Sequence, residues 1–277
     1  MTLPTELEDI LLSRQQSTLT VTLNRPQAKN ALNRAIVEGL FALLEALPAA
    51  SDVRTVVLRG AGNTFCAGGD IKDFAKQMIA PDPEPGSEDP VRIGNRAFGS
   101  ILQKLDQLPQ VLISVVEGAA FGGAMGFLSV SDVVIASPDA KFSLSETTLG
   151  IPPAQIGPFV VRKIGLFNAR RLALTGARFG AEEAADVGLV NTVSDQGGVD
   201  AALVDVLNAI GRCEPNAVAA TKHLLSAAAP AIDDQQLDDA SDDFVSCLRG
   251  AGRQGAAAFA SKQTPPWVET YSKTGEA

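Results

Sequence analysis

A glycine pair placed between a strand and a helix constrains this 277-residue chain more than any other feature of its sequence. The pair is Gly68-Gly69: the β-branched run 53–58 before it predicts a buried strand, and Asp70 after it predicts the N-cap of a helix over residues 71–78. Two glycines let the backbone approach a ligand closely, and the first N–H groups of a helix lack partners within it. An anion, or an oxygen that becomes one, suits such a corner, although a single Gly-Gly also occurs in ordinary tight turns.

A second corner of the same kind favours the ligand interpretation. The apolar run 111–116 predicts another strand, which leads into the glycine-rich stretch 118–126. This stretch contains Gly122-Gly123 and opens an apolar helix. Two such corners in one domain can supply two converging N–H donors, and an oxyanion hole needs two donors of this kind.

Composition and charge narrow the class of protein. Hydrophobic residues make up 45% of the chain, enough for a substantial core, and no apolar run approaches the length of a membrane span. The net charge of −9 argues against a nucleic-acid partner, and the acidic start of the chain is unlike a signal peptide. We therefore expect a cytoplasmic protein with neither a membrane nor a nucleic-acid partner.

The cysteine and histidine content gives no support for a metal site or a catalytic triad. The three cysteines Cys66, Cys213 and Cys247 are scattered, so we interpret them as reduced thiols. The single histidine, His223, lies in a predicted helix, where a surface or packing role is the simplest interpretation.

Several motifs along the chain occur together in one known family. They lie at residues 22–26 with 30–33, 65–70, 118–126, 142–153, 174–176 and 184–190. Together they resemble the crotonase (enoyl-CoA hydratase/isomerase) superfamily. That resemblance implies an α/β fold in which residues 1–200 form a crotonase-type spiral of ββα repeats and residues 201–277 form a C-terminal helical trimerisation region. It also implies a homotrimer, or a hexamer that is a dimer of trimers.

The residues themselves agree with an α/β core. Alternation of apolar and polar residues over 18–23 predicts a strand, and Asn33 predicts the N-cap of a helix that ends at Pro48. Further elements are expected from periodicity and from proline and glycine positions. These are a strand at 188–193 and helices at 162–174, 201–211, 216–228, 235–248 and 254–262.

Two charged stretches have simple interpretations. The acidic residues between 233 and 243 are interpreted as the start and solvated face of one helix. Residues 80–90 are rich in proline and acids and cannot build core, so we expect a mobile loop there. That loop is either a lid over the acyl pocket or a solvated insertion.

The resemblance implies a role for each glycine loop. The N–H groups of Gly69 and Gly123 are expected to donate to the thioester oxygen of an acyl-CoA, each worth on the order of 3 kcal/mol in the transition state. Glu146 is expected to move the proton, from a mostly apolar pocket that raises its pKa. Coenzyme A is part of the substrate, and no separate cofactor or metal is implied. Acyl-CoA contacts are implied for Arg25, Ala28, Ala67, Gly68, Gly69, Asp70, Ile71, Gly122, Gly123, Phe259 and Lys262.

One position departs from the family pattern. Hydratases of the family with two glutamates carry the first where this chain has Gly126, so the pair that holds water is incomplete. A single glutamate suits an isomerase, which takes a proton from one carbon and returns it to another. Residues 149–160, by contrast, resemble members that act on branched acyl-CoAs in acyclic terpene degradation. We expect a branched-chain enoyl-CoA hydratase, with an isomerase and a catalytically weak acyl-CoA-binding protein as alternatives.

Overall fold

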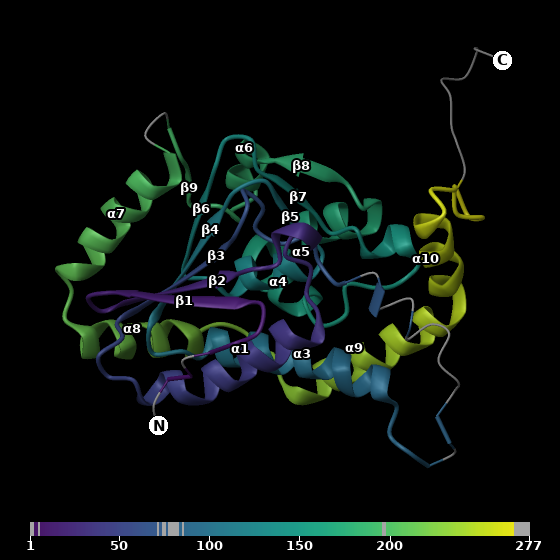
Figure 1. The fold of residues 1–277 in the computed structure, drawn as a ribbon, viewed down its shortest axis with the longest axis horizontal. Helices are drawn as coiled ribbons and strands as arrows, with labels where there is room; N and C mark the ends of the chain where they lie inside the picture. The colour runs from purple at the N-terminus through teal and green to yellow at the C-terminus, as the bar shows by residue number, and fades with distance from the viewer. Residues whose placement is uncertain are drawn as a thin grey trace.

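The computed structural model describes residues 3–4, 6–70, 72–73, 76, 83–84, 86–195 and 198–268. At its centre lies a six-stranded sheet (Figure 1). In spatial order its strands are β1 (Ile10–Gln15), β2 (Thr18–Leu23), β3 (Thr55–Gly60), β4 (Val111–Val116), β6 (Val133–Ala136) and β9 (Thr192–Val193). Only β1 runs antiparallel to its neighbour, so the carboxyl ends of the other five strands share one edge.

A small second sheet stands at that edge. It consists of β5 (Ala119–Phe121), β7 (Lys141–Ser143) and β8 (Arg178–Gly180). β5 begins directly after the end of β4, and an isolated bridge pairs Cys66 with Ala120. The chain that leaves β3 is therefore drawn against the chain that leaves β4.

Helices cover both faces of the central sheet (Figure 1). The longer ones are α1 (Arg34–Ala46), α3 (Pro90–Asp106), α4 (Gly123–Val130), α5 (Gly157–Thr175), α6 (Ala181–Asp186), α7 (Gly198–Gly211), α8 (Pro215–Ala227), α9 (Asp234–Cys247) and α10 (Arg253–Ala260). Short helical turns are η1 (Pro26–Ala28), η2 (Leu47–Ala49), η3 (Glu146–Leu149) and η4 (Leu248–Gly252). The expectation of an α/β fold with a helical C-terminal region is confirmed.

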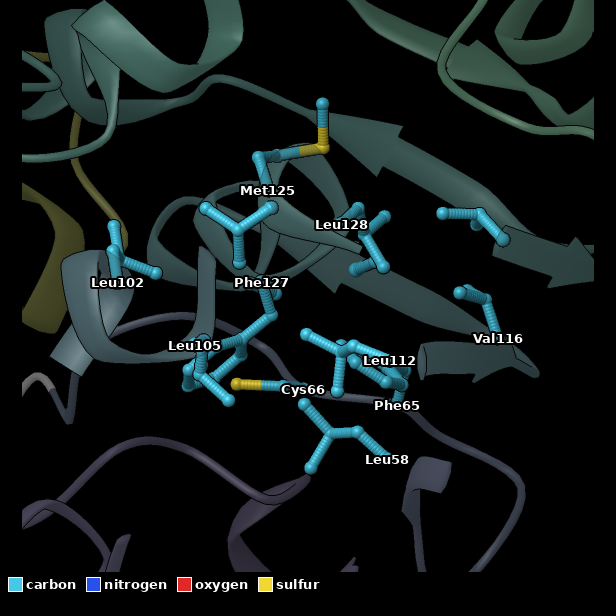
Figure 2. Packing of buried hydrophobic residues seen from close by; sticks show 14 of the residues in the cluster. Leu58, Phe65, Cys66, Leu102, Leu105, Leu112, Val116, Met125, Phe127 and Leu128 are labelled. Atoms are coloured by element: carbon cyan, nitrogen blue, oxygen red, sulfur yellow. The ribbon is translucent and has the colours of Figure 1, made fainter. Parts of the chain in front are cut away.

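Successive strand residues divide the core into two layers, because side chains alternate across a sheet. Leu58 and Leu112 belong to the larger cluster, which also buries α1 and α4, whereas Val57 and Ile113 pack with α7 on the other face. Figure 2 shows Cys66 among the side chains of the larger cluster. The first glycine loop is thus anchored in the core just before its glycines begin.

Two predicted elements differ most from the structure in where they begin. Helix α5 begins at Gly157, five residues before the predicted start, since Pro158 suits the first turn of a helix. The predicted strand 188–193 is wrong at its first four residues. There Gly188 has φ +82°, and the N–H groups of Leu189 and Val190 both donate to Ala184 O, which makes a turn.

The acidic run around α9 is more than a solvated face. Asp233 caps the helix through a capping box with Gln236, as its position predicts. Three further members, however, form ion pairs with Arg92 and Arg96 of α3, which lies beside α9 (Figure 1). Those three are Asp234, Asp238 and Asp242. These carboxylates remain between 38% and 77% exposed, so the interpretation as a solvated face holds for them. The i, i+4 spacing of both partners matches the two helices and adds the ion pairs.

Some predictions fall outside the described residues. The helix expected over 71–78 is described only at residues 72–73 and 76, and the loop expected over 80–90 only in part. The division of the chain at residue 200 stays a prediction. Of the cysteines, Cys66 is buried, Cys213 and Cys247 are exposed, and all three are free. Within the described ranges no helix is long and apolar enough to cross a membrane, and no group of three His, Cys, Asp or Glu side chains could hold a metal ion.

Candidate active site

The first glycine loop is held in an extended position beside β5. The N–H of Cys66 donates to Ala119 O over 2.9 Å, and the N–H of Phe121 donates back to Cys66 O over 3.0 Å. The Cys66 thiol then accepts the N–H of Gly68 over 3.4 Å. Gly68 has φ +94°, which only glycine adopts without strain. The chain reverses there, immediately before Gly69.

The N–H of Gly69 is aimed by a hydrogen bond at the other end of its own peptide group. Gly68 O accepts the N–H of Leu32 over 2.8 Å, and the N–H of Asp70 donates to Leu32 O over 3.0 Å. A trans peptide points its C=O and its N–H in opposite directions. The Gly69 N–H therefore points away from Leu32, and it has no acceptor among the described residues.

The second loop repeats this arrangement at the start of α4. The N–H of Gly122 donates to Ser143 O over 2.9 Å, and Gly122 O accepts the N–H of Met125 over 2.8 Å. The other end of the Gly122–Gly123 peptide is the N–H of Gly123, the first residue of α4. That group lies at the positive end of the helix dipole, where helical N–H groups have no partner within the helix.

The two loops touch through their backbones. A Cβ on Gly68 would lie 2.9 Å from Phe121 O and 3.7 Å from the Cα of Gly122. A side chain on Gly68 would therefore force the loops apart, and the positive φ values of Gly68 and Gly122 favour glycine at both positions. The structure thus brings together the two loops that contain Gly69 and Gly123, the predicted oxyanion donors.

Glu146 lies beside the second loop. It is the first residue of η3, and a Cβ on Gly122 would lie 3.2 Å from its Oε1. Its Oε2 is buried and has no hydrogen-bond partner within the described part of the chain. Burial raises the pKa of the Glu146 carboxyl to about 7, against a smaller lowering by its own backbone N–H. A carboxyl group with this pKa can both take up and release a proton near neutral pH.

The segment that carries Glu146 is held from two sides. Thr147 Oγ1 donates to Ala173 O over 2.8 Å, which ties η3 to the end of α5. On the other side α10 packs so closely that a Cβ on Gly255 would lie 2.1 Å from Leu149 O. Sequence reasoning missed Gly255. A glycine within a predicted helix could have indicated this contact, because glycine destabilises a helix and is expected there where another backbone packs closely.

The position of the missing glutamate is filled with apolar side chains. Gly126 is buried on α4, and a Cβ there would lie 2.7 Å from Ile156 Cγ2 and 2.9 Å from Leu102 Cδ1. A glutamate at this position would have to displace both neighbours. Glu146 therefore lies against Gly122 without a second carboxylate at position 126.

The residues expected to contact the acyl-CoA fall into two groups. The first lies in and around the glycine loops: Arg25, Ala28, Ala67, Gly68, Gly69, Asp70, Gly122 and Gly123. Phe259 and Lys262 lie elsewhere, on and just after α10, and the Phe259 side chain is exposed. Ile71 lies outside the described residues. Arg25 and Asp70 pair with each other over 2.9 Å.

Comparisons with known proteins agree with this geometry. A family model described as enoyl-CoA hydratase/isomerase matches residues 13–270. The mevalonyl-coenzyme A hydratase SIDH of Beauveria bassiana is 31% identical over 264 residues, which cover 92% of this chain and 93% of that protein. Among solved structures, an enoyl-CoA hydratase/isomerase of Marinobacter aquaeolei is 42% identical with a TM-score of 0.77, and Pseudomonas aeruginosa AtuE is 46% identical with a TM-score of 0.75. Each match covers 95% of this chain and 100% of the other.

Burial of Glu146 predicts a dependence of stability on pH. Its pKa rises from 4.5 to about 7 on folding, so between these values the folded protein holds a proton that the unfolded chain releases. The free energy of unfolding should therefore fall as pH rises through this window. Glu146→Gln removes the titration and should be more stable than the wild type above pH 7, on the order of 1–3 kcal/mol.

Urea unfolding of both proteins at several pH values between 5 and 8 measures this difference. Glu182→Gln, at an exposed position on α6, is the matched control for the change of a carboxyl to an amide. A flat difference for Glu146→Gln would show that the carboxyl is solvated in the folded protein.

Proposed function

Since the chain belongs to the enoyl-CoA hydratase/isomerase family of enzymes, we propose that it is a hydratase that adds water to the double bond of a branched enoyl-CoA, or removes it in reverse. The observation that carries this proposal is the buried carboxylate of Glu146 beside Gly122, together with the N–H groups of Gly69 and Gly123, which have no acceptor among the described residues. Glu146 supplies an acid–base group, and the N–H groups of Gly69 and Gly123 supply a site for an anion.

The glycine loops stabilise the charge that forms during the reaction. When oxygen adds to C3 of an enoyl thioester, the electron pair of the double bond moves toward the thioester oxygen and forms an enolate. The N–H groups of Gly69 and Gly123 donate to that oxygen. Because both are fixed before the substrate arrives, they stabilise the enolate without reorganisation, on the order of 3 kcal/mol each.

Glu146 moves the proton in two steps. Its carboxylate takes a proton from water as the oxygen bonds to C3, and the resulting carboxylic acid then gives a proton to C2 of the enolate. The carboxylate is regenerated, and the product has gained one water. A pKa near 7 suits both steps, since the group must act as base and then as acid at the same pH.

Water needs a second contact besides Glu146, because Gly126 provides none. Polar groups of the site or a carboxylate on the substrate itself can supply it. A glutaconyl-type acyl group would carry such a carboxylate, and the resemblance of residues 149–160 to members acting on branched acyl-CoAs, of the isohexenylglutaconyl type in terpene catabolism, supports that substrate class.

An isomerase is the alternative that Gly126 favours. In that reaction Glu146 takes a proton from C2 of a 3-enoyl-CoA and returns it to C4, and no water has to be held. A catalytically weak acyl-CoA-binding protein is the second alternative, since one of two glutamates is absent.

Heavy-oxygen water separates these activities. Turnover of branched and straight enoyl-CoAs in this solvent should place the label in the product of a branched substrate, as mass spectrometry would detect. Glu146→Gln should lower the rate by about a hundredfold or more, because proton transfer contributes at least that much. Glu182→Gln should keep full activity.

The opposite results are equally clear. Label-free product with a shifted double bond would establish the isomerase. Binding without turnover of any substrate in the panel would establish the acyl-CoA-binding protein.

We also propose that the chain assembles as a trimer or as a dimer of trimers. Large apolar side chains are exposed on α5 and α8, and an apolar surface of this kind marks an interface. They are Leu166, Phe167, Leu174, Leu224 and Leu225, with Phe167 exposed by 83%. Light scattering should give the mass of three or six chains, and Phe167→Asp should shift it downward. A wild-type monomer at micromolar concentration would rule this out.

A further inference from the structure

The guanidinium of Arg25 is surrounded by acceptors of its own chain. Its Nη1 lies 2.9 Å from Asp70 Oδ2 and its Nε lies 3.2 Å from Asp9 Oδ2. Nη1 also donates to Ala31 O over 2.6 Å. The side chains of Arg25 and Asp70 are only 16% and 12% exposed. The cation is therefore engaged with three oxygens before any ligand binds.

One of these contacts leads through two peptide groups to Gly69. Ala31 O, which accepts from Arg25, belongs to the same peptide group as the N–H of Leu32. That N–H donates to Gly68 O over 2.8 Å. Gly68 O in turn shares its peptide group with the N–H of Gly69. A continuous chain of hydrogen bonds thus runs from a partly buried cation to the proposed oxyanion donor.

A second contact holds the other side of the same glycine. Asp70 follows Gly69 directly, and its carboxylate is split between two tasks: Oδ2 pairs with Arg25, and Oδ1 accepts the N–H of Lys72 over 2.9 Å. Its own N–H donates to Leu32 O over 3.0 Å. Gly69 is therefore fixed from both neighbours, and Arg25 is common to both routes.

We propose that Arg25 is a positioning residue of the oxyanion hole, which orients and polarises the N–H of Gly69 through the Ala31–Leu32 and Gly68–Gly69 peptide groups. The proposal rests on the role of that N–H in the proposed function. It gives Arg25 and Asp70 a task different from contact with coenzyme A, which their place in the sequence implies.

Two physical effects act in this chain. Orientation is the larger, since a displacement of about 1 Å in a catalytic group can lower a rate by about a hundredfold. Polarisation adds to it, because a cation at one end of a hydrogen-bond chain strengthens each following donor, by about 10–30% per bond. Lysine cannot replace the fork of donors that reaches Ala31 and both carboxylates at once.

Acetoacetyl-CoA is a probe that reports the oxyanion hole without turnover. Bound as its enolate it carries the charge that the two N–H groups stabilise, and the enolate is followed by its near-ultraviolet absorbance. Arg25→Gln should weaken enolate binding by about tenfold or more, and Arg25→Lys should restore part of the loss. Binding of free coenzyme A, which lacks the acyl group, should be unchanged in both.

Two further variants complete the experiment. Asp70→Asn keeps the shape of the side chain and should show a smaller loss of enolate binding than Arg25→Gln. This variant tests the proposal if Arg25→Gln does not fold. Arg14→Gln breaks the exposed Arg14–Asp52 ion pair and should leave both affinities unchanged. Circular dichroism checks that each variant is folded.

The outcomes separate this proposal from the proposed function. If Arg25→Gln weakens coenzyme A and enolate binding equally, Arg25 is a ligand contact. If it leaves enolate binding unchanged, Arg25 does not position the N–H of Gly69. If the wild type binds the enolate but turns over no enoyl-CoA, the hydratase proposal is wrong and the positioning role of Arg25 is unaffected. If the wild type binds no enolate, both the positioning role of Arg25 and the oxyanion role of Gly69 are wrong.

Discussion

Backbone contact between two glycine loops is the constraint on which the site depends. Gly68 approaches Phe121 O so closely that it could not carry a side chain, and Gly68 and Gly122 both have positive φ. The contact is possible because the Cys66–Ala120 bridge draws the chain after β3 against the chain after β4 at the carboxyl edge of the sheet. Parallel strands place the loops that follow them at one edge of the sheet. Within these loops Gly68 O and Gly122 O are hydrogen-bonded, which leaves the N–H groups of Gly69 and Gly123 pointing the other way. Because Gly122 has no side chain, the carboxylate of Glu146 can lie directly against it.

Burial of one carboxylate and exclusion of a second are linked. A buried carboxyl without a partner is disfavoured when charged, so its pKa rises toward neutrality and the folded protein becomes less stable at high pH. A second carboxylate at position 126 would add a like charge nearby, but Ile156 and Leu102 occupy that space. The apolar filling therefore leaves Glu146 without a second carboxylate from position 126. Water in the proposed reaction then depends on Glu146 and on a second contact from other polar groups of the site or from the substrate.

The sequence predicts features that are local in the chain and fails for features that depend on distant segments. Apolar strands, glycine corners and N-caps such as Asn33 are encoded within a few residues, and the structure contains them. Glu146 was identified by resemblance, because its burial depends on loops far away in the sequence. The pairing of Arg25 with Asp70, and of Arg96 with Asp238, joins residues 45 and 142 positions apart, which no local pattern indicates. The predicted strand at 188–193 failed because Gly188 turns the chain before the residues that pair.

The central claim is that the N–H groups of Gly69 and Gly123 receive one oxygen of the substrate. A crystal structure of Glu146→Gln with an enoyl-CoA bound tests it most directly, since this variant should bind the substrate and leave it unreacted. We predict that the thioester oxygen lies about 2.7–3.1 Å from both nitrogens, with the side chain of residue 146 facing the double bond. A thioester oxygen bound to other groups, with either glycine N–H facing solvent, would contradict the claim.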